Sequence, residues 1–121
     1  MIQIVKDADT RPWFFLQTAH TTYGMRVMET GHLEHLYYGE RITVDSQDPA
    51  SCAPLVIQRA FAPGNTCTYD REHPQISMED VCLEVGTLGK GDIREPFLEV
   101  RFADGSVTSD FTFDSYEVIT L

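Results

Sequence analysis

The sequence contains no long run of apolar side chains. No segment approaches the roughly 18 apolar residues that a membrane-spanning helix needs. Residues 1–13 lack the apolar core of a secretory signal peptide, and the acidic residues from Asp7 onward disfavour a transit peptide. We therefore expect a cytoplasmic protein that does not enter a membrane.

Positive charge is scarce, with 9 lysine and arginine residues against 19 aspartate and glutamate residues and a net charge of -10. A field of this sign repels phosphate groups, which argues against nucleic-acid partners and against binding to anionic membranes. The length of 121 residues is that of one domain. A (β/α)₈ barrel needs about 250 residues and is therefore excluded.

Cysteine is also rare and follows no metal-binding pattern. Cys52, Cys67 and Cys82 are an odd number without a C-x-x-C pair, so we expect reduced thiols. His32 and His35 form an H-x-x-H pair, but a strand would direct the two rings to opposite faces. The sequence has no G-x-S-x-G, P-loop or G-x-G-x-x-G motif, and no two of its many carboxylates stand out as a pair. We expect no metal site and no cofactor.

Alternating apolar side chains predict β-strands near the N-terminus. Residues 2–4 begin a short strand, and residues 13–17 form a second one. Residues 23–28 and 33–38 alternate on either side of Thr30-Gly31, which predicts a hairpin.

The same alternation returns near the C-terminus. Residues 97–102 and 107–113 flank Asp104-Gly105, a strong hairpin signal, and a further strand begins at Tyr116. Between residues 43 and 91, long strands are interrupted by Pro49, Pro54, Pro63 and Pro74. One short helix is expected near residues 77–83. We predict an all-β fold, an antiparallel β-sandwich with a long irregular central loop region.

Two short segments carry side chains that the alternation does not explain. Tyr37 and Tyr38 are adjacent on a strand and point to opposite faces, which leaves one ring for solvent, a sugar or a partner. In residues 89–96, Asp92 and Arg94 flank an apolar residue and would pair on one face of a strand. This pair is either a structural ion pair at a turn or a polar corner presented to a partner domain.

Three parts of the sequence together resemble the N-terminal domain of α-galactosidases of glycoside hydrolase family 36. They are T-T-Y-G-M-R-V with G-H-L-E-H-L-Y-Y-G-E-R (21–41), Q-R-A-F-A-P (58–63), and L-E-V-G-T-L-G-K-G-D-I-R-E-P (83–96) with R-F-A-D-G-S-V-T-S-D-F (101–111). The resemblance implies a supersandwich of β-sheets followed by a catalytic (β/α)₈ barrel. Such enzymes are retaining hydrolases of terminal α-galactosides such as melibiose and raffinose.

The resemblance further implies that residues 1–121 are a single β-sandwich domain, or a fragment of one, without the catalytic barrel. No residue of this chain is then catalytic. Its partners would be the barrel of the parent enzyme and neighbouring subunits of a homo-oligomer, with α-galactoside sugars met indirectly. Gln58 and Arg59 are candidates for the edge of a substrate site, where an amide hydrogen-bonds sugar hydroxyls. Tyr38, Arg59 and Phe61 are candidates for an interface, with Tyr37 facing the core.

An alternative is a free-standing β-sandwich that binds carbohydrates or proteins. Its support is the supply of aromatic side chains, on which sugar rings stack: Trp13, Tyr37, Tyr38 and Tyr69. The two interpretations differ in whether a catalytic barrel follows this segment.

Overall fold

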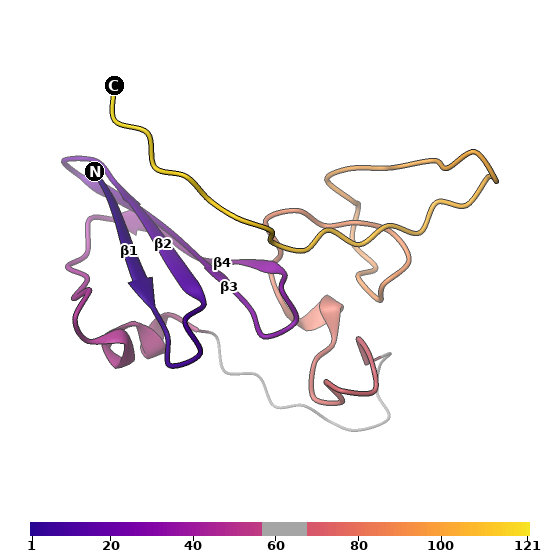
Figure 1. Cartoon of the computed structure of the whole chain (residues 1–121), viewed down its shortest axis with the longest axis horizontal. Coiled ribbons are helices and arrows are strands. Elements are labelled where there is room, and N and C mark those ends of the chain that lie inside the picture. The colour runs from indigo at the N-terminus through magenta and orange to yellow at the C-terminus, as the bar shows by residue number, and fades with distance from the viewer. Residues whose placement is uncertain (57–67) are drawn as a thin grey trace.

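The structure, a computed structural model, describes residues 1–56 and 68–121. Its centre is one antiparallel sheet with strand order β1-β2-β3-β4, in which each strand pairs with its neighbour in the sequence (Figure 1). The strands are β1 (Ile2–Lys6), β2 (Pro12–Gln17), β3 (Thr21–Val27) and β4 (Leu33–Glu40). Helical structure among the described residues is limited to two 3₁₀ helices, η1 (Pro49–Leu55) and η2 (Met78–Asp80). The all-β class predicted from the sequence is confirmed.

Side-chain and backbone hydrogen bonds close the turns between the strands. Between β1 and β2, Oδ1 of Asp7 accepts from the backbone N–H groups of Asp9 and Arg11, both at 2.9 Å. Between β3 and β4, Gly31 has a φ of 86° and donates its N–H to the carbonyl oxygen of Met28 at 2.9 Å. Glycine adopts this left-handed conformation without steric cost. The predicted hairpin across Thr30-Gly31 is therefore confirmed.

An irregularity in the β3–β4 pairing determines where the two adjacent tyrosines lie. The register shifts between Gly24 and Met25, so Gly24 pairs with Tyr37 whereas Met25 pairs with His35. Tyr38 is 69% exposed, as an outward-facing ring should be. Tyr37 lies beside Gly24 on the opposite face and is only half-buried, and its hydroxyl donates to the carbonyl oxygen of Glu40 at 2.8 Å. Tyr37 is thus on the face that carries the core, but it is not among the side chains packed against the core cluster.

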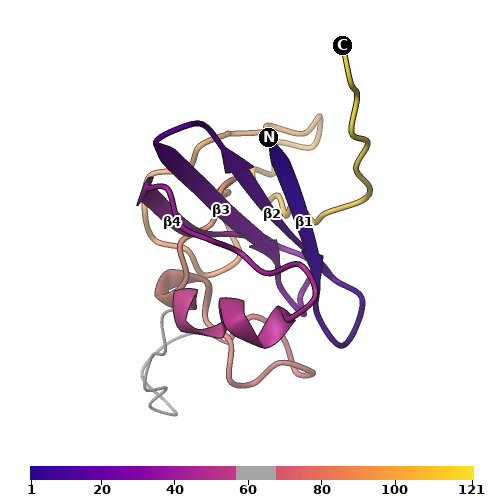
Figure 2. The same cartoon turned by 90° about the vertical axis from the view of Figure 1, so that its left-hand side faces the viewer.

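The hydrophobic core lies on one face of the sheet, beneath η1 (Figure 2). Its buried members are Val5, Trp13, Phe15, Val44 and Cys52, with Leu36, Ile42, Leu55 and Val56 packed against them. Asp48 caps η1 by accepting a hydrogen bond from the N–H of Ala50 at 3.2 Å. Pro49 follows at the start of the helix, where its missing N–H costs nothing.

The prediction of C-terminal strands is wrong, because residues 97–121 contain no strand. It places strands at residues 97–102, at 107–113 and from Tyr116 onward. The turn itself is present. Gly105 has a φ of 87°, and the N–H of Phe102 donates to the carbonyl oxygen of Ser106 at 2.9 Å. On either side of this turn the two segments form no ladder of backbone hydrogen bonds that would make them paired strands. The part of the chain that the structure describes therefore shows one sheet and no second sheet of a sandwich.

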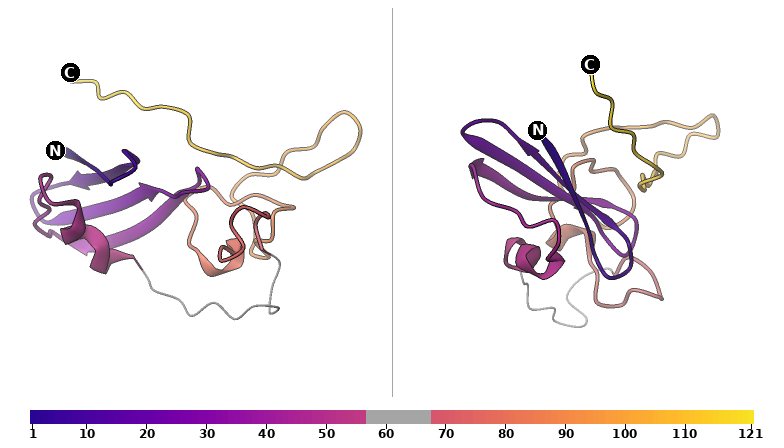
Figure 3. Two further views of the ribbon diagram at one scale, coloured as in Figure 1. Left: turned by 60° about the horizontal axis from the view of Figure 1, so that its bottom comes forward. Right: turned by 60° about the vertical axis from the view of Figure 1, so that its left-hand side comes forward.

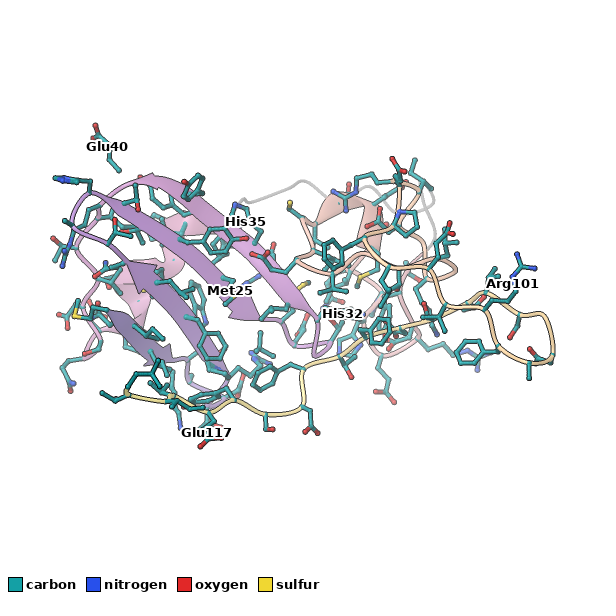
Figure 4. All side chains as sticks on the ribbon, turned by 90° about the horizontal axis from the view of Figure 1, so that it is seen from above. Met25, His32, His35, Glu40, Arg101 and Glu117 are labelled. Carbon is teal, nitrogen blue, oxygen red and sulfur yellow. The ribbon has the colours of Figure 1, made fainter. Side chains whose placement is uncertain are left out.

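Residues 97–109 form a projecting arm, and the chain then runs back along the sheet toward the N-terminus (Figures 1 and 3). Arg101 lies near the tip of this arm, at the opposite end of the molecule from Glu40 (Figure 4). The returning segment packs against β2 through aromatic rings, and the N–H of Phe113 also donates to the carbonyl oxygen of Gly31. The ring centroid of Phe14 lies 5.1 Å from that of Tyr116 and 6.0 Å from that of Phe113.

Candidate functional site

The face of the sheet opposite η1 carries an ordered group of aromatic side chains from β3 and β4. The ring centroid of Tyr23 lies 5.0 Å from that of His35 and 5.8 Å from that of Tyr38. Of these rings Tyr38 is the one that protrudes into solvent. We call Tyr23, His35, Tyr38 and Glu84, which completes the group, the tyrosine face.

Glu84 reaches this face because residues 82–84 run along β4 and extend the sheet locally. Leu83 forms an isolated antiparallel bridge with Glu34. The N–H of Glu84 donates to the carbonyl oxygen of Leu33 at 2.9 Å, and the N–H of His35 donates to that of Cys82 at 2.7 Å. The carboxylate of Glu84 is thereby placed beside the rings of Tyr23 and His35.

Both oxygens of the Glu84 carboxylate are engaged. The hydroxyl of Tyr23 donates to Oε2 at 2.5 Å, and Nδ1 of His35 lies 3.0 Å from Oε1. Burial, followed by the hydrogen bond and charge of Glu84, raises the pKa of Tyr23 to about 12. A phenol with this pKa stays protonated at neutral pH and is a poor general base. The carboxylate of Glu84 thus holds the rings of Tyr23 and His35 in place on the tyrosine face.

Tyr38 is the large exposed ring of this face. Its ring offers a large apolar area, and its hydroxyl can keep a hydrogen bond to water or to a partner. The neighbouring ring of Tyr23 supports it from one side.

Asp92 and Arg94 form an ion pair in a loop and not, as expected, along a strand. Nε of Arg94 lies 2.8 Å from Oδ1 of Asp92, and Nη2 lies 3.0 Å from Oδ2. Nη2 also donates to the carbonyl oxygens of Met78, at 3.1 Å, and of Val81. The guanidinium thus ties residues 92–94 to η2 and the residue that follows it.

The two histidines of the H-x-x-H pair have different partners. Nε2 of His32 lies 2.6 Å from Oδ1 of Asp110, whereas His35 contacts Glu84. Figure 4 shows His32 just before the start of β4 and His35 on the strand itself. Within residues 1–56 and 68–121, no three metal-binding side chains come together.

Four residues singled out from the sequence, Gln58, Arg59, Phe61 and Cys67, lie outside the described residues. The described residues on either side are well anchored. The N–H of Val56 donates to the carbonyl oxygen of Ala53 at 3.1 Å, and the N–H of Tyr69 donates to that of Ile76 at 2.8 Å.

Glu84 and Asp110 are the contacts that sequence reasoning missed. Glu84 is 61 residues away from Tyr23, and Asp110 is 78 residues away from His32. No local motif marks either carboxylate among the other acidic residues. Only the folded path of the chain brings these pairs together.

No helix in the described part of the chain has both the length and the apolar character needed to cross a membrane.

A family model, the glycosyl hydrolase family 36 N-terminal domain, matches residues 31–121. Among curated relatives, the bifunctional alpha-galactosidase/sucrose kinase AgaSK of Mediterraneibacter gnavus is 35% identical over 106 residues, which are 87% of this chain and 11% of the relative. The alpha-galactosidase AgaA of Geobacillus stearothermophilus is 28% identical over 105 residues, which are 87% of this chain and 13% of that protein. The chain therefore spans only about an eighth of the length of these relatives.

The fold matches solved structures of the same kind. The crystal structure of the alpha-galactosidase from Lactobacillus brevis superimposes with a TM-score of 0.75 at 33% sequence identity, covering 93% of this chain and 14% of that one. The match extends across the four-stranded sheet and beyond it. This chain belongs to the glycosyl hydrolase family 36 N-terminal domain family.

Proposed function

We propose that this chain is the accessory, non-catalytic N-terminal domain of an α-galactosidase that hydrolyses terminal α-galactosides of the melibiose and raffinose type. The observation that carries this proposal is the family match over residues 31–121. Retaining glycoside hydrolysis needs two carboxyl groups about 5–5.5 Å apart across a sugar-binding cleft. In our proposal the catalytic barrel of the parent enzyme supplies that pair of carboxyl groups. This domain supplies surfaces for assembly and for the edge of the substrate site.

The tyrosine face is the proposed contact with the barrel or with a neighbouring subunit. An exposed tyrosine backed by an ordered ring and a fixed carboxylate loses little conformational freedom when a partner covers it. Gln58 and Arg59 remain proposed contacts at the edge of a substrate site, and Phe61 a proposed interface residue.

We further propose that the protein forms a homo-oligomer in the cytoplasm. Free thiols at Cys52 and Cys82 are consistent with a reducing compartment. Exposed apolar side chains of the arm and C-terminal segment, such as Phe97 and Ile119, favour self-association. Light scattering at several protein concentrations tests this expectation, and a strictly monomeric mass at the highest concentration contradicts it.

Activity of the isolated chain tests the non-catalytic role. The purified 121-residue chain should not hydrolyse a chromogenic α-galactoside above a buffer blank. Turnover that survives repurification and follows the protein through a second column would overturn the proposal.

A free-standing carbohydrate-binding or protein-interaction module is the alternative, and the exposed ring of Tyr38 is the observation that favours it. Sugar rings stack on such exposed aromatic side chains. Reading the coding sequence beyond codon 121 separates the two: a barrel downstream supports the accessory role.

A further inference from the structure

β1 lies at the end of the sheet, and its outer edge has no backbone partner among the described residues. At the start of the β1–β2 ladder, the amino group of Met1 donates to the carbonyl oxygen of Gln17 at 2.7 Å, and the N–H of Gln17 donates back at 2.8 Å. Bonded pairs alternate with non-bonded pairs along an antiparallel ladder. The N–H and C=O groups of Ile2, Ile4 and Lys6 therefore point away from β2, toward the free edge. Such a row of groups is a template for one further strand.

Residues 116–121, which we call the tail, form a second unpaired element. Their sequence Y-E-V-I-T-L alternates and is rich in β-branched side chains, but none of their backbone groups bonds another described residue. Val118 and Ile119 are 49% and 70% exposed. The chain is fixed just before the tail, where the N–H of Phe113 donates to the carbonyl oxygen of Gly31 at 2.7 Å. The tail thus has the side chains of a strand and lacks only an edge with which to pair.

The tail runs toward the N-terminus while β1 runs away from it, so the two have the relative direction of antiparallel neighbours (Figures 1 and 2). Within one copy, no backbone hydrogen bond between described residues joins the tail to β1. The ring centroid of Tyr116 lies 5.1 Å from that of Phe14, which belongs to β2, the strand inside β1. This contact holds the beginning of the tail over the face of the sheet. The β1 edge and the rest of the tail are therefore both left open to a second copy.

The charges of the two elements are complementary. β1 carries Lys6 and no acidic residue, in a chain whose net charge is -10. Asp114 and Glu117 lie just before and within the tail, which has no basic residue. Opposite charges on facing strands are stabilising, whereas like charges directly opposite each other are destabilising. A tail therefore fits β1 better than it fits a second tail.

We propose that two copies of this chain pair through these elements, the tail of each copy adding as a fifth strand to the β1 edge of the other. This inference rests on the proposed homo-oligomer and names its interface. We expect Val118 to lie opposite Ile4. Because Ile4 pairs with Phe14 across the ladder, this register keeps Tyr116 on the face of the sheet that it already contacts. Both copies use the same two surfaces, so the assembly closes as a dimer.

Two proline variants of the tail test this pairing. In the expected register the N–H of Val118 bonds Ile4, whereas the N–H of Glu117 points away from β1. Val118→Pro therefore removes a ladder bond. Glu117→Pro is its matched control, since proline is tolerated where the N–H of an edge strand faces solvent. Both residues are exposed and have no backbone partner among the described residues, so neither change should unfold a single copy.

Light scattering over a range of concentrations measures the dimer dissociation constant of each chain. We expect a dimer for the parent, about the same dissociation constant for Glu117→Pro, and a constant at least about tenfold higher for Val118→Pro. Equal weakening by both prolines, or by neither, overturns this interface, while a dimer of the parent leaves the homo-oligomer standing. A strictly monomeric parent overturns both.

Amide exchange of the ¹⁵N-labelled parent shows which copy supplies the tail. We expect slow exchange at Ile2, Ile4 and Lys6 that is lost on dilution below the dissociation constant. The amides of Gln3 and Val5, which face β2, should stay protected at every concentration. Protection of Ile4 that persists on dilution would overturn the pairing between copies, because each tail would then close on its own chain.

Discussion

Nε2 of the buried His32 lies 2.6 Å from Oδ1 of Asp110, and this contact joins the β3–β4 turn to the C-terminal segment. The other oxygen of Asp110 accepts from the hydroxyl of Tyr69 at 2.5 Å, and Nδ1 of His32 lies 2.7 Å from Oγ1 of Thr30. Three separate parts of the chain thus meet at one carboxylate. Close by, the N–H of Phe113 donates to the carbonyl oxygen of Gly31 at 2.7 Å.

Asp110→Ala should lower the free energy of unfolding by about 2–3 kcal/mol, because it leaves the buried imidazole of His32 and the hydroxyl of Tyr69 without their acceptor. Chemical denaturation of the purified chain measures this loss. Asp114→Ala is the matched control, since Asp114 is exposed and bonds only its neighbour Ser115 among the described residues. A loss no larger than that of the control would show that the contact does not stabilise the fold.

Gly89→Ala should destabilise the chain by about 2–4 kcal/mol, because it adds a steric clash to a backbone conformation that alanine disfavours. Gly89 has a φ of 98°, and an added Cβ would lie 2.5 Å from Oγ1 of Thr108. Thermal and chemical unfolding measure the effect.

Gly105→Ala separates the two contributions. Gly105 has a similar φ of 87°, but an added Cβ would meet nothing within 4 Å. Its cost should be limited to the backbone, about 1 kcal/mol. If both variants unfold at the same denaturant concentration, the close approach of Gly89 to Thr108 is not part of the folded state.

The four N-terminal strands could be predicted from the sequence because each carries its own alternation and each turn has a local signal. Thr30-Gly31 is such a signal, and the structure has the glycine in the left-handed conformation there. The alternation at 97–102 and 107–113 is equally regular, but these residues pair with no strand edge. A period of two shows which side chains share a face, and it cannot show whether a partner strand exists.

The helix η1 and the carboxylates of the candidate site escaped prediction for different reasons. Pro49 and Pro54 suggested an irregular loop, whereas Pro49 in fact follows the cap residue Asp48 and begins the helix. Glu84 and Asp110 act over large sequence separations, so no local pattern could distinguish them from other surface acids. Tyr38 could be predicted to face outward because adjacent strand residues must point apart.

The raised pKa of Tyr23 leads us to predict that the chain loses stability in alkaline solution. Burial, then the hydrogen bond and charge of Glu84, raises the pKa of Tyr23 from 10.0 to about 12 in the folded chain. The folded state therefore holds this proton more tightly than the unfolded state does. The resulting stabilisation is fully present below pH 10 and is lost as the pH rises toward about 12.

Tyr23→Phe should flatten the dependence of the unfolding free energy on pH between about 10 and 12. At neutral pH it should lower the free energy of unfolding by about 1–2 kcal/mol, because the Glu84 carboxylate loses a donor. Tyr69 has the same raised pKa of about 12, so some alkaline dependence should remain. Urea unfolding at several pH values gives the profile. Tyr38→Phe, which alters an exposed ring, is the control and should follow the parent; a Tyr23→Phe profile that also follows the parent would contradict the bond to Glu84.

In our proposal this domain acts by docking onto a catalytic barrel, and light scattering of a reconstituted pair tests this docking most directly. The 121-residue chain is co-expressed with a family 36 α-galactosidase from which the matching N-terminal segment has been deleted. We predict a stable complex with one chain per barrel, more α-galactosidase activity than the truncated enzyme has alone, and a weaker complex for Tyr38→Ser. A folded chain that elutes apart from the truncated enzyme, and leaves its activity unchanged, would contradict the account.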